Sequence, residues 1–408
     1  MYSRRSVLLG AVSPAVLPSR AARRSYSWAE IERMIARGDI KGKLTRDDLP
    51  TPALLLDLDA FERNVERMAR HAKARGRRLR PHAKTHKCPE IARALMRAGA
   101  VGACTAKISE AEVLAEHGIS GLLVTSAPVG RHRIERALRL ARKAPDTVFC
   151  VDDAGNAREL SEAARQARLR VNLAIELLVG QRSGIACGRP ALELAQLIDS
   201  LPNVRLAGLQ AYSGPSSHVV GFEARRKHSI EAMTPAVETR RLIEKSGIEC
   251  GWLSGGSTGT YNIDSEIDGV DELQPGSYIF MDIDYNLIGG RDGELYRDFE
   301  NSLTVLATVY SKPSPDVAIV DAGLKSFATD RKFGPAPKDL PGVRYSWLGD
   351  EHGKLDLAQA PREVKLGDRI EFVVPHCDPT VNLYDHLYCL RGDEVEAVWR
   401  IAARGMNQ

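Results

Sequence analysis

The feature of this sequence that most restricts its fold is a regular alternation of short apolar segments and longer amphipathic ones between residues 60 and 280. The apolar segments have the length and composition of strands, and most are followed by Ala/Leu/Arg-rich segments with helical spacing. The predicted strands are Arg77–Lys84, Val101–Thr105, Gly121–Thr125, Thr147–Val151, Arg170–Val179, Arg205–Ala211, Glu249–Ser254 and Glu272–Ile279. Eight strands that alternate with helices over about 200 residues predict a TIM-type (β/α)8 barrel.

The same alternation also fits an open, doubly wound sheet. That alternative is disfavoured because no G-x-G-x-x-G sequence follows the first predicted strand. After about Asp284 the helical patterns end, and short strand-like segments joined by Gly, Pro and Asp take over, such as Ser302–Tyr310 and Arg369–Val374. The predicted fold class is therefore α/β, with a barrel over residues 63–284 and a mostly β domain over residues 285–408.

The N-terminus has the composition of an export signal. Arg4 and Arg5 precede an uncharged and largely apolar stretch from Ser6 to Ser19, which is typical of a twin-arginine leader. A disordered basic tail is the alternative interpretation. We therefore predict a leader over residues 1–25 and a periplasmic location, with a cytoplasmic location as the alternative. Residues 26–62 would form an N-terminal segment that begins with a helix.

The charge of the chain argues against a nucleic-acid partner. Lys and Arg number 57 and Asp and Glu number 53, but five of the arginines lie in residues 1–25. The rest of the chain carries 52 basic and 53 acidic residues, and a near-neutral body is a poor match to phosphate backbones. No apolar run long enough for a membrane span follows the N-terminal segment.

The first candidate site is the segment Arg80–Lys87, at the end of the first predicted strand. Alternate residues of a strand share a face, so Arg80, His82 and Lys84 are expected to point together into the barrel mouth, where such folds place catalysis. A partly buried lysine there can lose its proton and form a Schiff base with a carbonyl compound. The alternative is a solvated basic loop.

The second candidate site is the Gly/Ser/Thr segment from Ser254 to Thr260, which follows the seventh predicted strand. Glycines let backbone N–H groups crowd around an anion, and hydroxyl groups add further donors. TIM barrels often bind phosphate in the loops after strands seven and eight. Tyr278, near the eighth strand, would add a hydroxyl to the same anion. A flexible turn is the alternative interpretation.

The third candidate site is the segment Pro375–Thr380 in the β domain. In an extended segment His376 and Asp378 share a face, and Cys377 faces away. An imidazole and a carboxylate, with water completing the shell, suit Mn²⁺, Mg²⁺ or Zn²⁺. A simple His–Asp hydrogen bond at a domain edge is the alternative interpretation.

Together the three motifs resemble the fold-type III pyridoxal phosphate enzymes, whose fold is alanine racemase-like. Within that class they are most similar to the group of D-threonine aldolase and D-serine dehydratase. The resemblance covers roughly residues 50–395 and is most specific in Pro81–Lys87 and His376–Thr380. Further matches are Gln181–Gly184, Gln210–Gly214 with His218, and Pro275–Tyr278.

The resemblance implies a role for each matching residue. Lys84 would carry pyridoxal phosphate covalently, and Tyr212 would line the cofactor pocket. Arg182 would lie against the pyridine nitrogen and, because a guanidinium holds its protons, would keep that nitrogen unprotonated. His218 would lie on the substrate side, where either it or a metal-bound water would be the catalytic base. Phosphate binding would fall to Gly255, Gly256, Ser257, Thr258 and Tyr278, and metal binding to His376 and Asp378.

The resemblance also implies a reaction and an assembly. Dehydratases of the group tend to carry cysteine two positions after the metal histidine, whereas here that position is Asp378. This favours an aldolase that cleaves D-threonine and related D-3-hydroxy amino acids to glycine and an aldehyde. Mn²⁺ is the preferred ion, with Mg²⁺, Co²⁺ or Zn²⁺ as alternatives, and a homodimer is expected. The resemblance further implies that a short strand in residues 26–62, for which Ala53–Leu56 is suited, joins the C-terminal β domain.

Other functions remain open at this stage. One is a D-serine or D-3-hydroxyaspartate dehydratase of the same family. A second is an amino-acid racemase, or a small cofactor-handling protein of the same fold type. A third is a non-enzymatic periplasmic binding protein, which only the N-terminal leader suggests. The roles of Asp321 and Lys325 stay unassigned, including whether they reach the site across a dimer interface.

Overall fold

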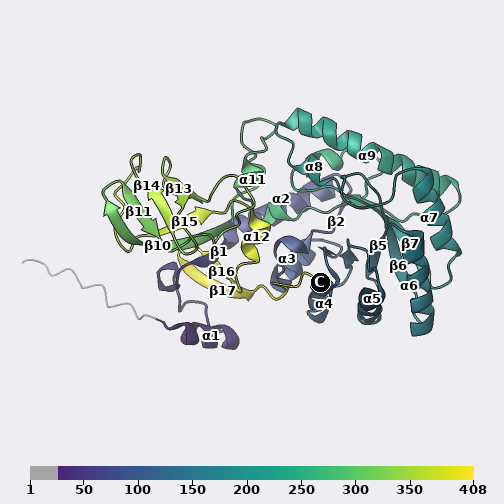
Figure 1. Cartoon of the computed structure of the whole chain (residues 1–408), viewed down its shortest axis with the longest axis horizontal. Coiled ribbons are helices and arrows are strands. Elements are labelled where there is room, and N and C mark those ends of the chain that lie inside the picture. Colours follow the sequence, from purple (N-terminus) through teal and green to yellow (C-terminus); the bar gives the residue numbers. More distant parts are fainter. Residues whose placement is uncertain (1–25) are drawn as a thin grey trace, which may run out of the picture.

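A computed structural model describes residues 26–408, which form a barrel and a β domain side by side (Figure 1). The barrel strands make one eight-stranded parallel sheet in the order β2-β9-β8-β7-β6-β5-β4-β3. They are β2 (Arg78–Leu79), β3 (Cys104–Thr105), β4 (Leu123–Val124), β5 (Val148–Val151), β6 (Val171–Glu176), β7 (Val204–Ala211), β8 (Leu253–Gly255) and β9 (Glu272–Leu273). All eight lie within, or one residue beyond, the predicted segments.

The two end strands of this sheet meet and close the ring. The Val101 N–H donates to the Leu79 carbonyl at 2.8 Å, and the Cys104 N–H donates to the Pro81 carbonyl at 3.0 Å. His82 and Cys104 form a parallel bridge between the segments that follow β2 and contain β3. The predicted α/β barrel is therefore confirmed, and the open-sheet alternative is wrong.

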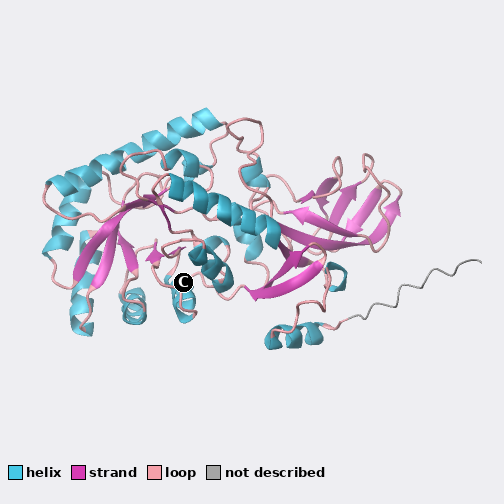
Figure 2. Cartoon of the chain, turned by 180° about the vertical axis from the view of Figure 1, so that it is seen from behind, coloured by secondary structure: helices cyan, strands magenta, loops and turns pink. Residues whose placement is uncertain are grey.

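Helices surround the barrel because their apolar faces cover the outside of the parallel sheet. In α5, for example, Ile134, Ala137, Leu138 and Ala141 are buried at helical spacing. Figure 2 shows these helices around the strands. The longer ones are α2 (Leu58–Ala74), α3 (Pro89–Arg97), α4 (Ile108–Glu116), α5 (Arg131–Lys143), α6 (Ala154–Ala167), α7 (Arg189–Ser200) and α9 (Phe222–Lys245).

Short helical turns follow the strands at the end of the barrel that faces the β domain. Such turns hold side chains where the carboxyl ends of parallel strands converge. They are the 3-10 turns η2 (Ala83–Thr85) and η3 (Ser277–Ile279), and the helices α8 (Gly214–Ser217), α10 (Tyr261–Asp264) and α11 (Ile283–Asn286).

The β domain is a nine-stranded sheet with strand order β13-β14-β11-β10-β1-β16-β17, in which β15 pairs with β10 and β12. β1 (Ala53–Asp57), from the N-terminal segment, lies between β10 and β16 and continues directly into α2. The other strands are β10 (Leu303–Ser314), β11 (Val317–Val320), β12 (Ala336–Pro337), β13 (Arg344–Trp347), β14 (Gly353–Asp356), β15 (Arg369–Val373), β16 (His386–Arg391) and β17 (Glu394–Arg400). The predicted mostly β domain is thus confirmed.

Three further helical elements join these parts. The N-terminal helix α1 (Trp28–Arg37) begins with a capping box between Ser27 and Glu30. The 3-10 turn η1 (Arg46–Asp48) leads from it to β1. Helix α12 (Cys377–Val381) leaves the β domain and packs against η2 of the barrel. The contact between α12 and η2 brings the two most specific sequence motifs together.

Within residues 26–408, no helix is both long and apolar enough to span a membrane.

Candidate active site

Lys84 lies in η2, at the end of the barrel that faces the β domain. Its side chain is 40% exposed, and its ammonium group contacts the carboxylate of Asp378 on α12. The small cavity beside Lys84 is lined by residues from the ends of three other strands, among them Tyr212, Ser257 and Gly276, and by Tyr285 on α11. The lysine motif and the His376–Asp378 motif, almost 300 residues apart in the chain, therefore meet in one cleft between the two domains.

The charge on Lys84 depends on this contact. Withdrawal from water lowers the pKa of Lys84, but the neighbouring Asp378 carboxylate outweighs it and raises the pKa above its ordinary value. The sequence had suggested a lysine that loses its proton readily. In the structure Asp378 stabilises the ammonium form instead, because the two side chains form an ion pair.

Arg80 does not point into the mouth, so the expectation that Arg80, His82 and Lys84 share a face is wrong. The Arg80 guanidinium forms an ion pair with Glu272 at 2.7 Å inside the barrel and also donates to the Gly121 carbonyl, ahead of β4. The physical reason is that β2 ends at Leu79, after which Pro81 and η2 turn the chain. Of these three residues, only His82 and Lys84 line the cavity.

The loop after β8 is built so tightly that its glycines are required. A Cβ on Gly255 would lie 2.2 Å from the Ala211 carbonyl oxygen, and Gly256 has a φ of +74°. Ser257 and Thr260 are held by hydrogen bonds from their hydroxyl groups to each other, at 2.9 Å. The Thr260 hydroxyl also donates to Asp264, a carboxyl whose pKa burial raises to about 6.

Tyr278 contacts the loop after β8 through its backbone N–H and not through its hydroxyl. Its N–H donates to the Thr258 hydroxyl at 3.0 Å, but its ring is buried and packs against Phe299, with centroids 5.4 Å apart. Gly276 and Ser277 line the cavity at this point. The expectation that the Tyr278 hydroxyl meets the anion is therefore wrong, since η3 turns the side chain into the core.

Arg182 and Tyr212 lie together at the ends of neighbouring strands β6 and β7. The Arg182 guanidinium lies over the Tyr212 ring, 5.5 Å from its centroid, and donates to Glu176 at 3.1 Å. Glu176 also accepts a hydrogen bond from Ser183 at 2.9 Å. The two residues thus lie together beside the cavity, and Tyr212 forms part of its wall.

His218 follows α8 and forms an ion pair with Asp284 on α11, with 3.0 Å between His218 Nδ1 and Asp284 Oδ2. Its ring also packs against Tyr285, at a centroid distance of 4.9 Å. Burial raises the pKa of Asp284, but hydrogen bonds from His218 and Arg331 outweigh it and lower the pKa to about 2. Asp284 is therefore a carboxylate at neutral pH and accepts the Nδ1 proton of His218.

His376 and Asp378 do not lie in an extended segment, and that expectation is wrong. His376 is the residue before α12, and Asp378 lies within its first turn. Cys377 does not face away from Asp378, since its thiol donates to the Asp378 carboxylate at 3.4 Å. Burial raises the pKa of the Cys377 thiol well above its ordinary value, so it is a neutral thiol rather than a thiolate ligand.

The Asp378 side chain is a negatively charged carboxylate, which can bind a cation. Burial raises its pKa, but the nearby charges of Lys84 and His376 outweigh it and lower the pKa below its ordinary range. His376 Nδ1 lies 2.8 Å from Asp330 Oδ2, which leaves Nε2 of the imidazole as the nitrogen with a lone pair. Asp378 is thus the carboxylate that metal binding requires, and Nε2 is the His376 nitrogen that Asp330 does not contact.

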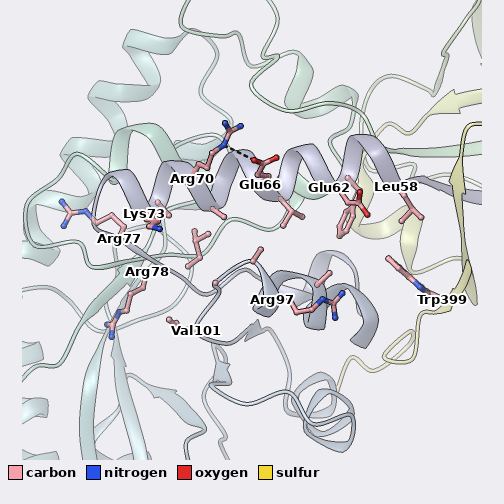
Figure 3. Close-up of a pocket in the computed structure, with 18 of the residues that line it drawn as sticks. Leu58, Glu62, Glu66, Arg70, Lys73, Arg77, Arg78, Arg97, Val101 and Trp399 are labelled. Carbon is pink, nitrogen blue, oxygen red and sulfur yellow. Dashed lines mark ion pairs between the residues drawn. The ribbon is translucent and has the colours of Figure 1, made fainter. Parts of the chain in front are cut away.

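A much larger hollow than the cavity beside Lys84 lies elsewhere in the described part of the chain. It has a volume of about 840 Å³ and runs between α2, α3 and β17, where Leu58, Glu62, Lys73 and Trp399 line it (Figure 3). Its lining is mostly apolar and its rim is charged. The candidate catalytic side chains converge instead on the cleft between the domains, so size alone does not locate the site.

Comparison with known proteins agrees with this geometry. Residues 56–284 match the family model of the alanine racemase N-terminal domain, and residues 302–390 match a serine dehydratase domain. The chain is 41% identical over 360 residues to D-threonine aldolase from Arthrobacter sp., a match that covers 88% of this chain and 93% of that protein. The chain belongs to the D-threonine aldolase family.

Other members of this family bear out the assignment. A crystal structure of D-threonine aldolase from Filomicrobium marinum superposes with a TM-score of 0.85 at 40% identity, covering 89% of this chain and 98% of that one. 3-Hydroxy-D-aspartate aldolase from Paracoccus denitrificans (strain Pd 1222) is 36% identical, with coverage of 89% and 94%. D-threo-3-hydroxyaspartate dehydratase from Delftia sp. (strain HT23) is 30% identical, with coverage of 88% and 96%.

Family membership implies pyridoxal phosphate, and the residues present fit it. Lys84 supplies an amine inside the cavity, and the Ser257–Thr258 loop supplies donors with no room for side chains at Gly255. The Thr85 hydroxyl, which lines the same cavity, is buried without a hydrogen-bond partner in the described residues. A Cβ on Gly276 would lie 2.5 Å from that hydroxyl. This combination is what a phosphate-bearing aldehyde requires.

A divalent ion would need ligands beyond the protein. Among residues 26–408, no cluster of three or more His, Cys, Asp and Glu side chains has the arrangement of a metal site. His376 and Asp378 offer one imidazole nitrogen and one carboxylate, a donor pair that suits an ion whose shell is completed by water or substrate.

Sequence analysis missed three residues of this site. Asp284 and Asp330 contact the predicted histidines, and Arg331 contacts both aspartates, but the three lie in loops and a short helix without a recognisable motif. Of the two residues left unassigned, Asp321 accepts hydrogen bonds from Thr51 and Thr308 within the β domain. Lys325 forms an exposed ion pair with Glu351.

Proposed function

We propose that this protein is a pyridoxal phosphate- and divalent metal-dependent aldolase that cleaves D-threonine and related D-3-hydroxy amino acids to glycine and an aldehyde. The observation that carries the proposal is the meeting of Lys84 with Asp378 and His376 in one cleft, which puts a cofactor lysine beside a metal-type donor pair. Sequence identity to two aldolases supports the same reaction.

The chemistry divides between the bound groups and the chain. Pyridoxal phosphate, when bound, accepts the electron pair that the breaking Cα–Cβ bond leaves behind. A divalent ion on His376 and Asp378 would place positive charge beside the substrate's 3-hydroxyl and lower the pKa of that hydroxyl. The reaction needs no oxidant, since the proton lost from the hydroxyl is balanced by one gained at Cα.

The chain's own residues hold the reactants and move this proton. Lys84 anchors the cofactor, Tyr212 lines the cavity beside it, and Arg182 lies over the Tyr212 ring. His218 is the base that we assign to the 3-hydroxyl. Its Nδ1 proton is held by Asp284, so Nε2 has the free lone pair that accepts a proton. Its side chain is 37% exposed, which allows the proton to exchange with solvent.

Mn²⁺ is the ion that we propose. A carboxylate with an imidazole favours a hard or borderline cation, whereas a thiolate would select Zn²⁺. Cys377 is adjacent in sequence, but burial keeps its thiol neutral. Mg²⁺, Co²⁺ and Zn²⁺ remain the ions to compare with Mn²⁺ in the same assay.

A dehydratase is the second candidate function. Its support is the match of residues 302–390 to a serine dehydratase domain and the 30% identity to the Delftia enzyme. Asp378, where dehydratases of the group tend to carry cysteine, favours cleavage instead. The test is to incubate the purified protein with pyridoxal phosphate, Mn²⁺ and either D- or L-threonine. Glycine is expected from the D isomer only, and 2-oxobutyrate as the main product would support the dehydratase.

The family resemblance further supports a homodimer, which a molar-mass measurement in solution would test. We propose a small-molecule substrate as the main partner. The balanced charge outside residues 1–25 disfavours nucleic acid, and no stable membrane association is proposed.

Export through the twin-arginine pathway is a separate proposal, for residues that lie outside the described part of the chain. Arg4 and Arg5 before an uncharged stretch motivate it. Residues 1–25 fused to a reporter that is active only after twin-arginine export should give periplasmic activity, and the double change Arg4→Lys, Arg5→Lys should abolish it. A reporter that stays in the cytoplasm with the unmodified leader would leave the cytoplasmic alternative standing.

A further inference from the structure

Each of the two histidines assigned to the reaction is held by a carboxylate through the same ring nitrogen. His218 Nδ1 lies 3.0 Å from Asp284 Oδ2, and His376 Nδ1 lies 2.8 Å from Asp330 Oδ2. An ionised carboxylate can only accept a hydrogen bond, so both Nδ1 atoms carry the proton. In the neutral rings both Nε2 atoms therefore keep a lone pair, one for a proton and the other for a metal ion.

One arginine joins the two carboxylates. Arg331 Nε lies 3.0 Å from Asp284 Oδ1, and Arg331 Nη2 donates to Asp284 Oδ2 at 3.0 Å. Arg331 Nη1 donates to Asp330 Oδ2 at 2.8 Å. The planar guanidinium thus donates to Asp284 through Nη2 and to Asp330 through Nη1, while its Nε lies beside Asp284 without a hydrogen bond. Lysine, which presents a single charged nitrogen, cannot reproduce this fork.

The five side chains come from both domains. His218 and Asp284 belong to the barrel end, after α8 and on α11, whereas Asp330, Arg331 and His376 belong to the β domain. The chain of contacts therefore fixes the base and the metal histidine relative to each other across the cleft.

We propose that Arg331 is a positioning residue which, through Asp284 and Asp330, aligns His218 and His376 for the reaction. This inference rests on the proposed function, because that function gives the two histidines their roles. Arg331 and Asp330 are 27% and 41% exposed. The Arg331–Asp330 pair contributes little to stability at such exposure. The unfolding temperatures of the variants separate any effect of the less exposed Arg331–Asp284 pair on folding from its effect on ring orientation.

The test uses the full chain loaded with pyridoxal phosphate and compares Asp284→Asn, Asp330→Asn, Arg331→Leu and Arg331→Lys. Arg344→Leu is the matched control, because Arg344 forms one exposed ion pair with Asp356 far from the cleft. The Mn²⁺ dissociation constant is measured without substrate by titration calorimetry. The values of kcat and KM for D-threonine are measured at saturating Mn²⁺, and the unfolding temperature is recorded for each variant.

Distinct effects are expected for each change. Asp330→Asn should weaken Mn²⁺ binding roughly 10- to 100-fold, as outer-shell changes at metal sites do, and added Mn²⁺ should restore most of its kcat. Asp284→Asn should change Mn²⁺ affinity by less than about twofold but lower kcat about tenfold or more with little change in KM. Arg331→Leu should show both defects, and Arg331→Lys should recover at most one of them.

Arg331→Leu with wild-type Mn²⁺ affinity and kcat would overturn the proposal, as would losses that only follow a lowered unfolding temperature. The failure of the proposed function looks different. In that case the wild-type protein binds Mn²⁺ but does not cleave D-threonine, and the metal-affinity comparison of Asp330→Asn and Arg331→Leu still decides whether Arg331 positions His376.

Discussion

Replacing Lys84 with alanine is expected to abolish covalent cofactor binding and to lower D-threonine cleavage by at least about a thousandfold, because no other amine takes its place in the cleft. Lys84 lines the cavity with Ser257 and Gly276, whereas Lys87 is buried elsewhere and contacts Glu110 and Asn407. After dialysis the variant should have lost the visible absorption of the bound cofactor. Borohydride reduction of the wild-type protein should label the peptide that contains Lys84.

Lys84→Arg is the matched control for this prediction. Arginine can keep an ion pair with Asp378, so the electrostatic contact between the domains survives, but a guanidinium does not condense with an aldehyde. Both variants should therefore be folded and inactive. A borohydride label on Lys87 or Lys107 would mean that the cofactor lysine has been assigned wrongly.

Removing the divalent metal should stop cleavage while leaving the cofactor in place. Stabilising the ionised 3-hydroxyl is worth several kcal/mol, so chelation is expected to lower the rate by roughly a thousandfold or more. The visible absorption should remain, because the proposed cofactor site at Lys84 and the Ser257 loop consists of other residues than the proposed metal ligands. His376→Ala and Asp378→Ala should behave as the chelated protein does. His376→Ala tests metal binding alone, whereas Asp378→Ala also removes a contact with Lys84.

Cys377→Ser is the control for the metal prediction. The thiol of Cys377 is neutral and donates to Asp378, and a serine hydroxyl can replace that donor. The variant should retain most of its activity and its Mn²⁺ affinity. If Cys377→Ser loses the metal while His376→Ala keeps it, the thiol is the ligand, and both the metal assignment and the preference for cleavage drawn from Asp378 are wrong.

The barrel could be predicted from the sequence because its strands are buried on both faces. In β6, for example, all six residues from Val171 to Glu176 are buried, which gives a near-continuous apolar run. Strands of the β domain such as β13 (Arg344–Trp347) were missed, because alternate residues are exposed and the segment is short. Periodicity alone does not separate such a strand from a polar loop.

The candidate site could be predicted only where a motif marks it. Lys84, the Gly255–Thr258 loop and the His376–Asp378 pair were found because their residue types are unusual at those spacings. The orientation of the Arg80 and Tyr278 side chains could not be predicted in this way. It depends on where β2 and β9 end and on the turns η2 and η3 that follow. Asp284 and Arg331 are acidic and basic residues like many others, and only the fold brings Asp284 to His218 and Arg331 to Asp284.

The most direct test of the proposed reaction is product analysis with D-threonine, pyridoxal phosphate and Mn²⁺. Cleavage of the Cα–Cβ bond gives glycine and acetaldehyde in equal amounts, whereas elimination gives 2-oxobutyrate and ammonia. We expect glycine and acetaldehyde to account for the D-threonine consumed, and the reaction to stop on chelation. Equal amounts of 2-oxobutyrate and ammonia, without acetaldehyde, would contradict the assignment of His218, His376 and Asp378 to carbon–carbon bond cleavage.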